Sequence, residues 1–158
     1  MALVLFQYAM DPTLAMGVTN QQSGSPLSLQ SVTGNPNLIT WNYNPLNQLI
    51  TLAASGTPGL CVTIPGASCS GTPVLQLQQP LPLSNANSKF QQWRQLGSTT
   101  YLTSVGCSTQ VVDAQNRSPA VGTPLWLYPY NGSPAQQWIV SSLLQSDIKE
   151  RLQELEKA

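Results

Sequence analysis

Asp113 is one of only two carboxylates in the first 141 residues, and a short run of aromatic side chains follows it. An ionised carboxylate only accepts hydrogen bonds, so it can take the protons of two neighbouring hydroxyl groups at once. Trp126 and Tyr128 lie in a segment where strand alternation turns Leu125 and Leu127 inward and the aromatic rings outward. Residues of these types could, if they come together, contact a ligand that combines hydroxyl groups with a flat apolar face.

The sequence lacks the residue types on which many catalytic and metal sites depend. It contains no histidine, which excludes a Ser-His-Asp triad, a Cys-His dyad and a histidine-ligated metal. Asp11 and Asp113 come from distant parts of the chain, and nothing in the sequence pairs them for acid–base work. We therefore expect no enzymatic activity, no metal and no cofactor.

The three cysteines, Cys61, Cys69 and Cys107, allow two interpretations. None of them forms a Cys-x-x-Cys pair, which argues against a zinc site. Cys61 and Cys69 are eight residues apart and could close a small loop, leaving Cys107 free. The other interpretation, which the sequence favours, is three unpaired thiols in a reducing cell.

Charge is scarce, since charged residues make up 8% of the chain and the net charge is zero. Nucleic acids and anionic membranes attract clustered Lys and Arg, so we expect neither as a partner. The first ten residues lack a positive region and a cleavage site and are too short to cross a bilayer. We expect a strand there, no signal peptide and no membrane insertion. The protein would be cytoplasmic, exported by another route, or part of a larger secreted protein.

A two-part pattern occurs three times along the chain. Gly-x-Pro followed by Leu-x-Leu recurs at 24–30, 71–78 and 122–128, and each copy precedes a tryptophan, namely Trp41, Trp93 and Trp138. One such unit cannot bury its apolar face alone, whereas three can close around an axis and cover each other. The sequence predicts an all-β fold of about twelve short strands, a pseudo-three-fold β-trefoil, with repeats at 1–46, 47–96 and 97–141.

Two of the tryptophans close Q-x-W motifs, Gln91-Gln92-Trp93 and Gln136-Gln137-Trp138. Together with the repeat length, these motifs resemble the ricin-type β-trefoil lectins over the whole body of the chain. The first copy departs, because Ile39 stands where the motif has Gln. The resemblance implies that the three tryptophans are core residues. It also implies up to three shallow pockets, one per repeat, that bind galactose or a related sugar.

The resemblance assigns ligand contacts most fully in the third repeat. It implies that Asp113 accepts hydrogen bonds from sugar hydroxyls, that Tyr128 stacks on the sugar and that Gln136 adds a donor. We expect Trp126 beside this pocket. Asn131 is a further candidate, because Ala135 stands where the family often has an asparagine.

The other two repeats lack this combination of side chains. The aspartate position falls on Gly17 in the first repeat and on Thr63 in the second, and the aromatic position falls on Gln30 and Gln78. We expect two degenerate pockets and one candidate sugar-binding pocket.

Residues 142–158 differ from the body of the chain in composition and hold seven of its twelve charged side chains. Leu144, Ile148, Leu152 and Leu155 recur at helical spacing, which predicts a short amphipathic helix. This helix could dock on the body, associate with a second copy, lead to an adjoining domain, or be a fused segment.

Three functions fit these observations. The first is a carbohydrate-binding lectin-like module for galactose-type glycans. The second is a protein-interaction or structural trefoil with decayed sugar sites. The third is the targeting domain of a larger toxin or hydrolase.

Overall fold

A computed structural model describes residues 2–56, 59–96, 101–143, 153 and 155 of the chain. Each predicted repeat contributes four β-strands, and six short 3₁₀ turns lie between the described strands, which confirms an all-β fold of twelve strands. The strands of the first repeat are β1 (Ala2–Tyr8), β2 (Asp11–Gly17), β3 (Ser28–Ser31) and β4 (Trp41–Asn44). Those of the second are β5 (Leu49–Leu52), β6 (Cys61–Thr63), β7 (Gln76–Gln78) and β8 (Trp93–Leu96). Those of the third are β9 (Tyr101–Ser104), β10 (Gln110–Ala114), β11 (Leu125–Pro129) and β12 (Trp138–Leu143).

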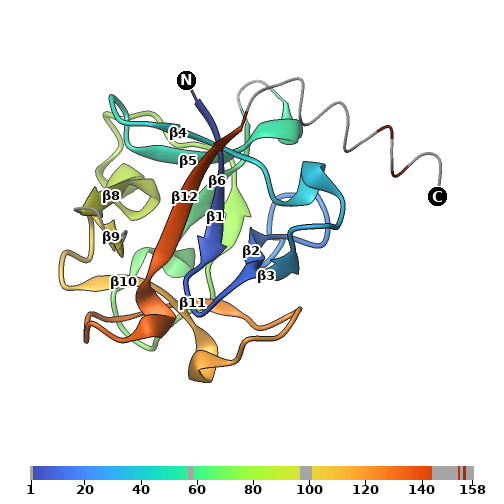
Figure 1. The fold of residues 1–158 in the computed structure, drawn as a ribbon. Coiled ribbons are helices and arrows are strands. Elements are labelled where there is room, and N and C mark those ends of the chain that lie inside the picture. Colours follow the sequence, from blue (N-terminus) through green and yellow to red (C-terminus); the bar gives the residue numbers. More distant parts are fainter. Residues whose placement is uncertain (1, 57–58, 97–100, 144–152, 154, 156–158) are drawn as a thin grey trace.

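The first and last strands pair and so join the two ends of the body. β1 and β12 run antiparallel, with a register from Leu3 opposite Leu143 to Tyr8 opposite Trp138. In Figure 1 these two strands lie side by side. Antiparallel neighbours also join β4 to β5 and β8 to β9, which links each repeat to the next.

A ring of backbone hydrogen bonds relates the three repeats about one axis. The N–H of Leu27 donates to the carbonyl of Leu75, Leu75 donates to Leu125, and Leu125 donates back to Leu27, at 2.8, 2.9 and 3.1 Å. All three leucines are fully buried, and each is the first leucine of a Gly-x-Pro-Leu or Gly-x-Pro-x-Leu copy. A closed cycle of equivalent bonds needs three equivalent partners, so the predicted pseudo-three-fold symmetry is confirmed.

The repeated tryptophans form a layer of the core. Trp41, Trp93 and Trp138 are at most 1% exposed. Each indole N–H donates to a strand carbonyl, at Met16, Val62 and Val112 respectively, so the polar end of each buried ring is satisfied. This confirms that the motif tryptophans are core residues.

The cysteine interpretations were both wrong. Cys69 and Cys107 form a disulfide that joins the second repeat to the third, with the two Cα atoms 5.6 Å apart. Cys61 is the free thiol and is fully buried in β6. The loop that carries Cys69 meets the turn before β10, a contact between repeats that the spacing of the cysteines along the chain does not reveal.

The predicted C-terminal helix falls mostly outside the described residues. Ser142 and Leu143 belong to β12, so the strand runs two residues past the predicted boundary of the body. Gln153 and Leu155 are helical and exposed, and the rest of 144–158 is not described. Its docking or self-association stays a prediction.

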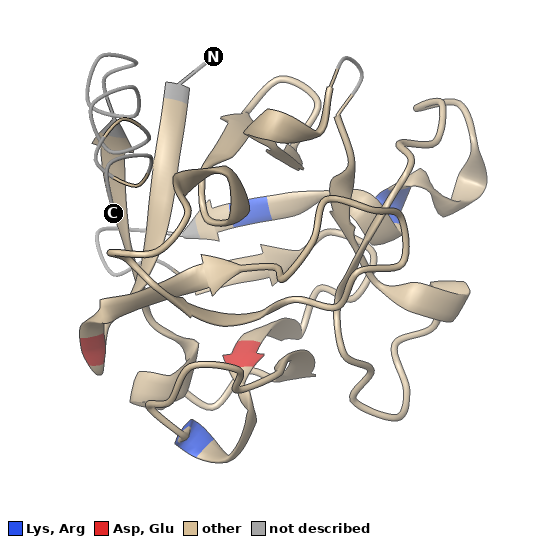
Figure 2. Ribbon diagram, turned by 90° about the vertical axis from the view of Figure 1, so that its right-hand side faces the viewer, with Lys and Arg blue, Asp and Glu red and all other residues tan. Residues whose placement is uncertain are grey.

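The described surface carries little charge. Figure 2 shows a few well-separated Lys, Arg, Asp and Glu positions on an otherwise uncharged body. No helix within the described ranges is long and apolar enough to span a membrane. Among the same residues, no three Cys, Asp or Glu side chains gather where they could hold a metal ion.

The disulfide predicts the number of reactive thiols. Unfolded without reductant, the protein should show one thiol per chain toward an aromatic disulfide reagent, and three after reduction. Native protein should react very slowly, because burial raises the pKa of Cys61 to about 11 and the thiolate is the reactive form. Three thiols in unfolded, unreduced protein would contradict this pairing.

Candidate functional site

The antiparallel pairing of β10 with β11 brings the predicted ligand residues together. Asp113 lies opposite Trp126, and Val111 lies opposite Tyr128. Asp113, Trp126, Tyr128 and Asn131 line one pocket of about 190 Å³. Four of the five side chains singled out from the sequence therefore border the same cavity.

Asp113 is buried at the edge of this pocket and is held by two protein donors. It is 5% exposed. Trp126 Nε1 donates to Oδ1 at 2.8 Å, and Gln136 Nε2 donates to Oδ2 at 3.0 Å. A carboxylate offers about four acceptor positions, so each oxygen keeps capacity for one more donor. The protein thus fixes the orientation of the carboxylate and leaves acceptor positions for a ligand.

Burial raises the pKa of Asp113 above its ordinary value, because a charged carboxylate loses hydration inside the protein. The hydrogen bonds from Trp126 and Gln136, and the nearby positive charge of Arg117, act in the opposite direction and lower this pKa. The burial effect is the largest, so the net pKa change is upward.

Gln136, the fifth of these residues, is not among those that line the pocket, and its contact with a ligand stays a prediction. The side chain is fully buried. Besides its bond to Asp113, Nε2 donates to the carbonyl of Pro129 at 2.9 Å, and Oε1 accepts from the N–H of Asn131 at 2.9 Å. Gln136 is a positioning residue that holds both the carboxylate and the loop around Asn131.

An aromatic pair forms another wall of the pocket. The rings of Trp126 and Tyr128 are stacked, with centroids 5.2 Å apart and an angle of 20° between their planes. Leu125 and Leu127 are fully buried while the two aromatic residues are half-buried, as strand alternation predicted. The bond from the indole to Asp113 fixes Trp126, and the stacking fixes Tyr128 against it.

Three pocket residues escaped the sequence analysis: Asn116, Arg117 and Ser133. Asn116 and Arg117 lie in η5 (Gln115–Arg117), a 3₁₀ turn that begins two residues after Asp113, and both have left-handed backbone angles. Ser133 precedes η6 (Pro134–Gln136) and is 8% exposed. Its Oγ is the only buried side-chain oxygen or nitrogen of the described residues without a hydrogen-bond partner. Only their closeness in sequence to Asp113 and Gln136 could have indicated that these three residues line the pocket.

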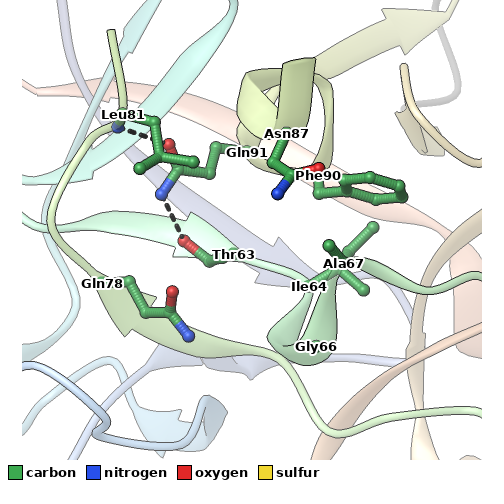
Figure 3. A pocket seen from close by; sticks show the side chains of 9 residues that line it. All are labelled: Thr63, Ile64, Gly66, Ala67, Gln78, Leu81, Asn87, Phe90 and Gln91. Carbon is green, nitrogen blue, oxygen red and sulfur yellow. Dashed lines mark hydrogen bonds between the residues drawn. The ribbon is translucent and has the colours of Figure 1, made fainter. Parts of the chain in front are cut away.

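The second repeat has a larger pocket at the equivalent place, about 340 Å³ in volume (Figure 3). Gln91 repeats the role of Gln136, since its Nε2 donates to Thr63 Oγ1 and to the Gln79 carbonyl, and its Oε1 accepts from the N–H of Leu81. Thr63 stands where the third repeat has Asp113, and Gln78 where it has Tyr128. Without a carboxylate or a stacked ring pair, this pocket cannot make the contacts described for the third repeat. Its degeneracy as a sugar site stays a prediction.

The first repeat has no room for a side chain at the aspartate position. A Cβ on Gly17 would lie 2.7 Å from the Leu38 carbonyl oxygen and 2.9 Å from a methyl group of Ile39. Ile39 replaces the motif glutamine, so the polar pair of the other repeats is absent here.

The raised pKa of Asp113 predicts how its contribution to stability changes with pH. The folded state binds a proton more tightly than the unfolded state, so the contribution of this group is largest below the unfolded pKa of about 4. It is lost as the pH rises through the folded pKa. The difference in unfolding free energy between wild type and Asp113→Ala, measured by urea denaturation, should therefore fall with rising pH in this range and then level off. A difference that grows over this range would contradict the assignment.

The comparisons with known proteins concern the whole fold. No protein-family model matches the sequence, and no curated protein matches it. Among solved structures, a mosquitocidal holotoxin is similar with a TM-score of 0.75 and 17% identity, over 90% of this chain but only 17% of the toxin. The designed three-fold symmetric protein ThreeFoil is similar with a TM-score of 0.73 and 20% identity, over 89% of this chain and 99% of ThreeFoil. The C-half of the earthworm R-type lectin, solved with GalNAc, is similar with a TM-score of 0.70 and 13% identity, over 90% of this chain and 100% of the lectin half.

These likenesses are too low in sequence identity to carry more than the fold. The three-fold design and the lectin half are matched over almost their whole length, and the holotoxin over a small part of its own. The resemblance found in the Q-x-W motifs is therefore confirmed for the architecture: this chain has the β-trefoil fold of the R-type lectins.

Proposed function

We propose that this chain is a carbohydrate-binding module whose third repeat holds one galactose-type sugar. One observation carries the proposal. Asp113 accepts one hydrogen bond at each oxygen, from Trp126 and from Gln136, keeps further acceptor capacity, and lines a pocket walled by the stacked Trp126 and Tyr128 rings. An oriented acceptor beside a flat apolar surface matches a ring with vicinal hydroxyl groups on one side and C–H groups on the other.

The size and polar groups of the pocket support a small ligand with hydroxyl groups. Its volume of about 190 Å³ lies below the roughly 300–1,000 Å³ typical of sites for drug-sized molecules. The unpartnered hydroxyl of Ser133 offers one more polar contact for a sugar hydroxyl. Asn131 supplies another, because among the described residues only its side-chain Oδ1 is engaged, accepting from the N–H of Ser133. Shallow single sites bind weakly, and a Kd near millimolar corresponds to about −4 kcal/mol.

A second candidate is the targeting domain of a larger protein. It is favoured by the likeness to the holotoxin, of which the matched region is 17%. The binding chemistry of the third-repeat pocket would be the same, and catalysis or toxicity would belong to other segments. A protein-interaction trefoil with decayed sites is the remaining alternative, and it predicts no binding to any glycan.

Replacing Asp113 tests the proposal. Hydrogen bonds to a charged group are worth about 1.5–3 kcal/mol each, so Asp113→Ala should weaken galactose binding at least about tenfold in a calorimetric or NMR titration. The matched control is Thr63→Ala, at the equivalent position of the second repeat, which should leave Kd unchanged. Asp113→Ala also removes the acceptor of the Trp126 and Gln136 donors, which should lower the stability of the fold. The titrations should therefore be made well below the melting temperature of the variant.

Two results would count against the proposal. Wild type that binds neither galactose nor any glycan of a broad array would favour the protein-interaction alternative. Equal Kd values for wild type and Asp113→Ala would move the sugar site away from the third repeat.

A further inference from the structure

Tyr130 and Tyr101 form a second aromatic pair outside the pocket. Their rings meet edge to face, with centroids 4.9 Å apart. Tyr130 is 55% exposed, and Tyr101, at the start of β9, is half-buried. The contact holds the Tyr130 ring in one orientation and leaves much of its surface open to solvent. The core of the protein makes no use of this exposed ring.

The pair continues the aromatic wall of the pocket. Tyr130 follows β11, and its N–H still donates to the carbonyl of Thr109 at 2.9 Å, so the strand geometry extends to this residue. Tyr128 and Tyr130 therefore face the same side, and two residues of extended chain separate them by about 6.6 Å. The Tyr130 hydroxyl lies close to Gly132: a Cβ atom added to Gly132 would be 3.6 Å from this hydroxyl oxygen. Gly132 stands between Asn131 and Ser133, which line the pocket.

The backbone of this loop suits close approach by the ring. Gly132 has a φ of +71°, a left-handed conformation that glycine adopts without strain. The loop is held from inside, since the N–H of Asn131 donates to Gln136 Oε1 and the N–H of Ser133 donates to Asn131 Oδ1. Tyr130 therefore lies at the rim of the pocket, against the loop that carries the lining residues Asn131 and Ser133.

We propose that Tyr130, braced by Tyr101, is a second stacking platform that binds the next sugar of a glycan whose first sugar occupies the Asp113 pocket. This inference rests on the proposed function and extends it: the preferred ligand is an oligosaccharide, not a free monosaccharide. The pocket holds one ring, and the rim offers a flat apolar surface to a neighbouring ring. No charged side chain is part of the rim pair, so the second sugar is held mainly by contact with the ring.

The experiment compares galactose with β-1,3-galactotriose on wild type, Tyr130→Ala and Tyr130→Phe. Wild type should bind the trisaccharide about 3- to 10-fold more tightly than galactose, which is the range expected for one aromatic contact. Tyr130→Ala should remove this gain and leave the galactose Kd unchanged. Tyr130→Phe keeps the ring and should keep the gain. Leu83→Ala, which truncates a 58% exposed apolar side chain in the second repeat, is the matched control and should alter neither Kd.

The outcomes separate this inference from the proposed function. If Asp113→Ala abolishes galactose binding but Tyr130→Ala leaves the trisaccharide gain intact, the rim platform is wrong and the pocket stands. The rim platform is also wrong if wild type binds galactose and the trisaccharide with equal Kd. If wild type binds neither sugar, the proposed function and the rim platform fail together.

Discussion

One hydrogen bond, made three times, sets the geometry on which the site depends. The indole N–H of each motif tryptophan donates to the carbonyl of Met16, Val62 or Val112, at 2.9, 3.0 and 3.3 Å. A buried carbonyl without a donor costs about 1–3 kcal/mol, so this bond strongly fixes the strand at that residue. The next residue in each strand is the site position, 17, 63 or 113. The core therefore decides where each repeat can present a ligand group.

The residue two positions before each tryptophan decides whether that site position can be polar. Gln91 and Gln136 each bind a loop carbonyl, a loop N–H and the side chain at the site position. A buried polar side chain needs such a partner. Where Ile39 replaces the glutamine, the site position is Gly17, and the Leu38 carbonyl oxygen and the Ile39 side chain occupy the space that a Cβ would need. The site position and the motif position are therefore polar in the same repeats, because each polar side chain needs the other as a partner when it is buried.

The second and third repeats share this framework but present different surfaces. Thr63 offers a neutral hydroxyl where Asp113 offers a carboxylate, and the stacked rings occur only beside Asp113 among the described repeats. The Cys69–Cys107 disulfide ties these two repeats together near the second pocket. Backbone bonds from Val105 and Gly106 to the carbonyls of Gln92 and Lys89 strengthen the same junction. A common scaffold can therefore carry one charged site and one neutral pocket.

The sequence alone determined the trefoil, because a pattern that recurs three times is visible along the chain, and strand alternation turned Trp126 and Tyr128 outward. The burial of the tryptophans and the nearness of Asp113 to these two rings followed from the resemblance that the Q-x-W motifs carry. The sequence could not tell that Gln136 is buried and donates to Asp113, since a side-chain amide can bind a ligand or another protein group. It likewise missed Ser133 and the Cys69–Cys107 pairing. Those depend on which loops meet when the three repeats close around their axis, and that distance in space is set by tertiary packing rather than by separation along the chain.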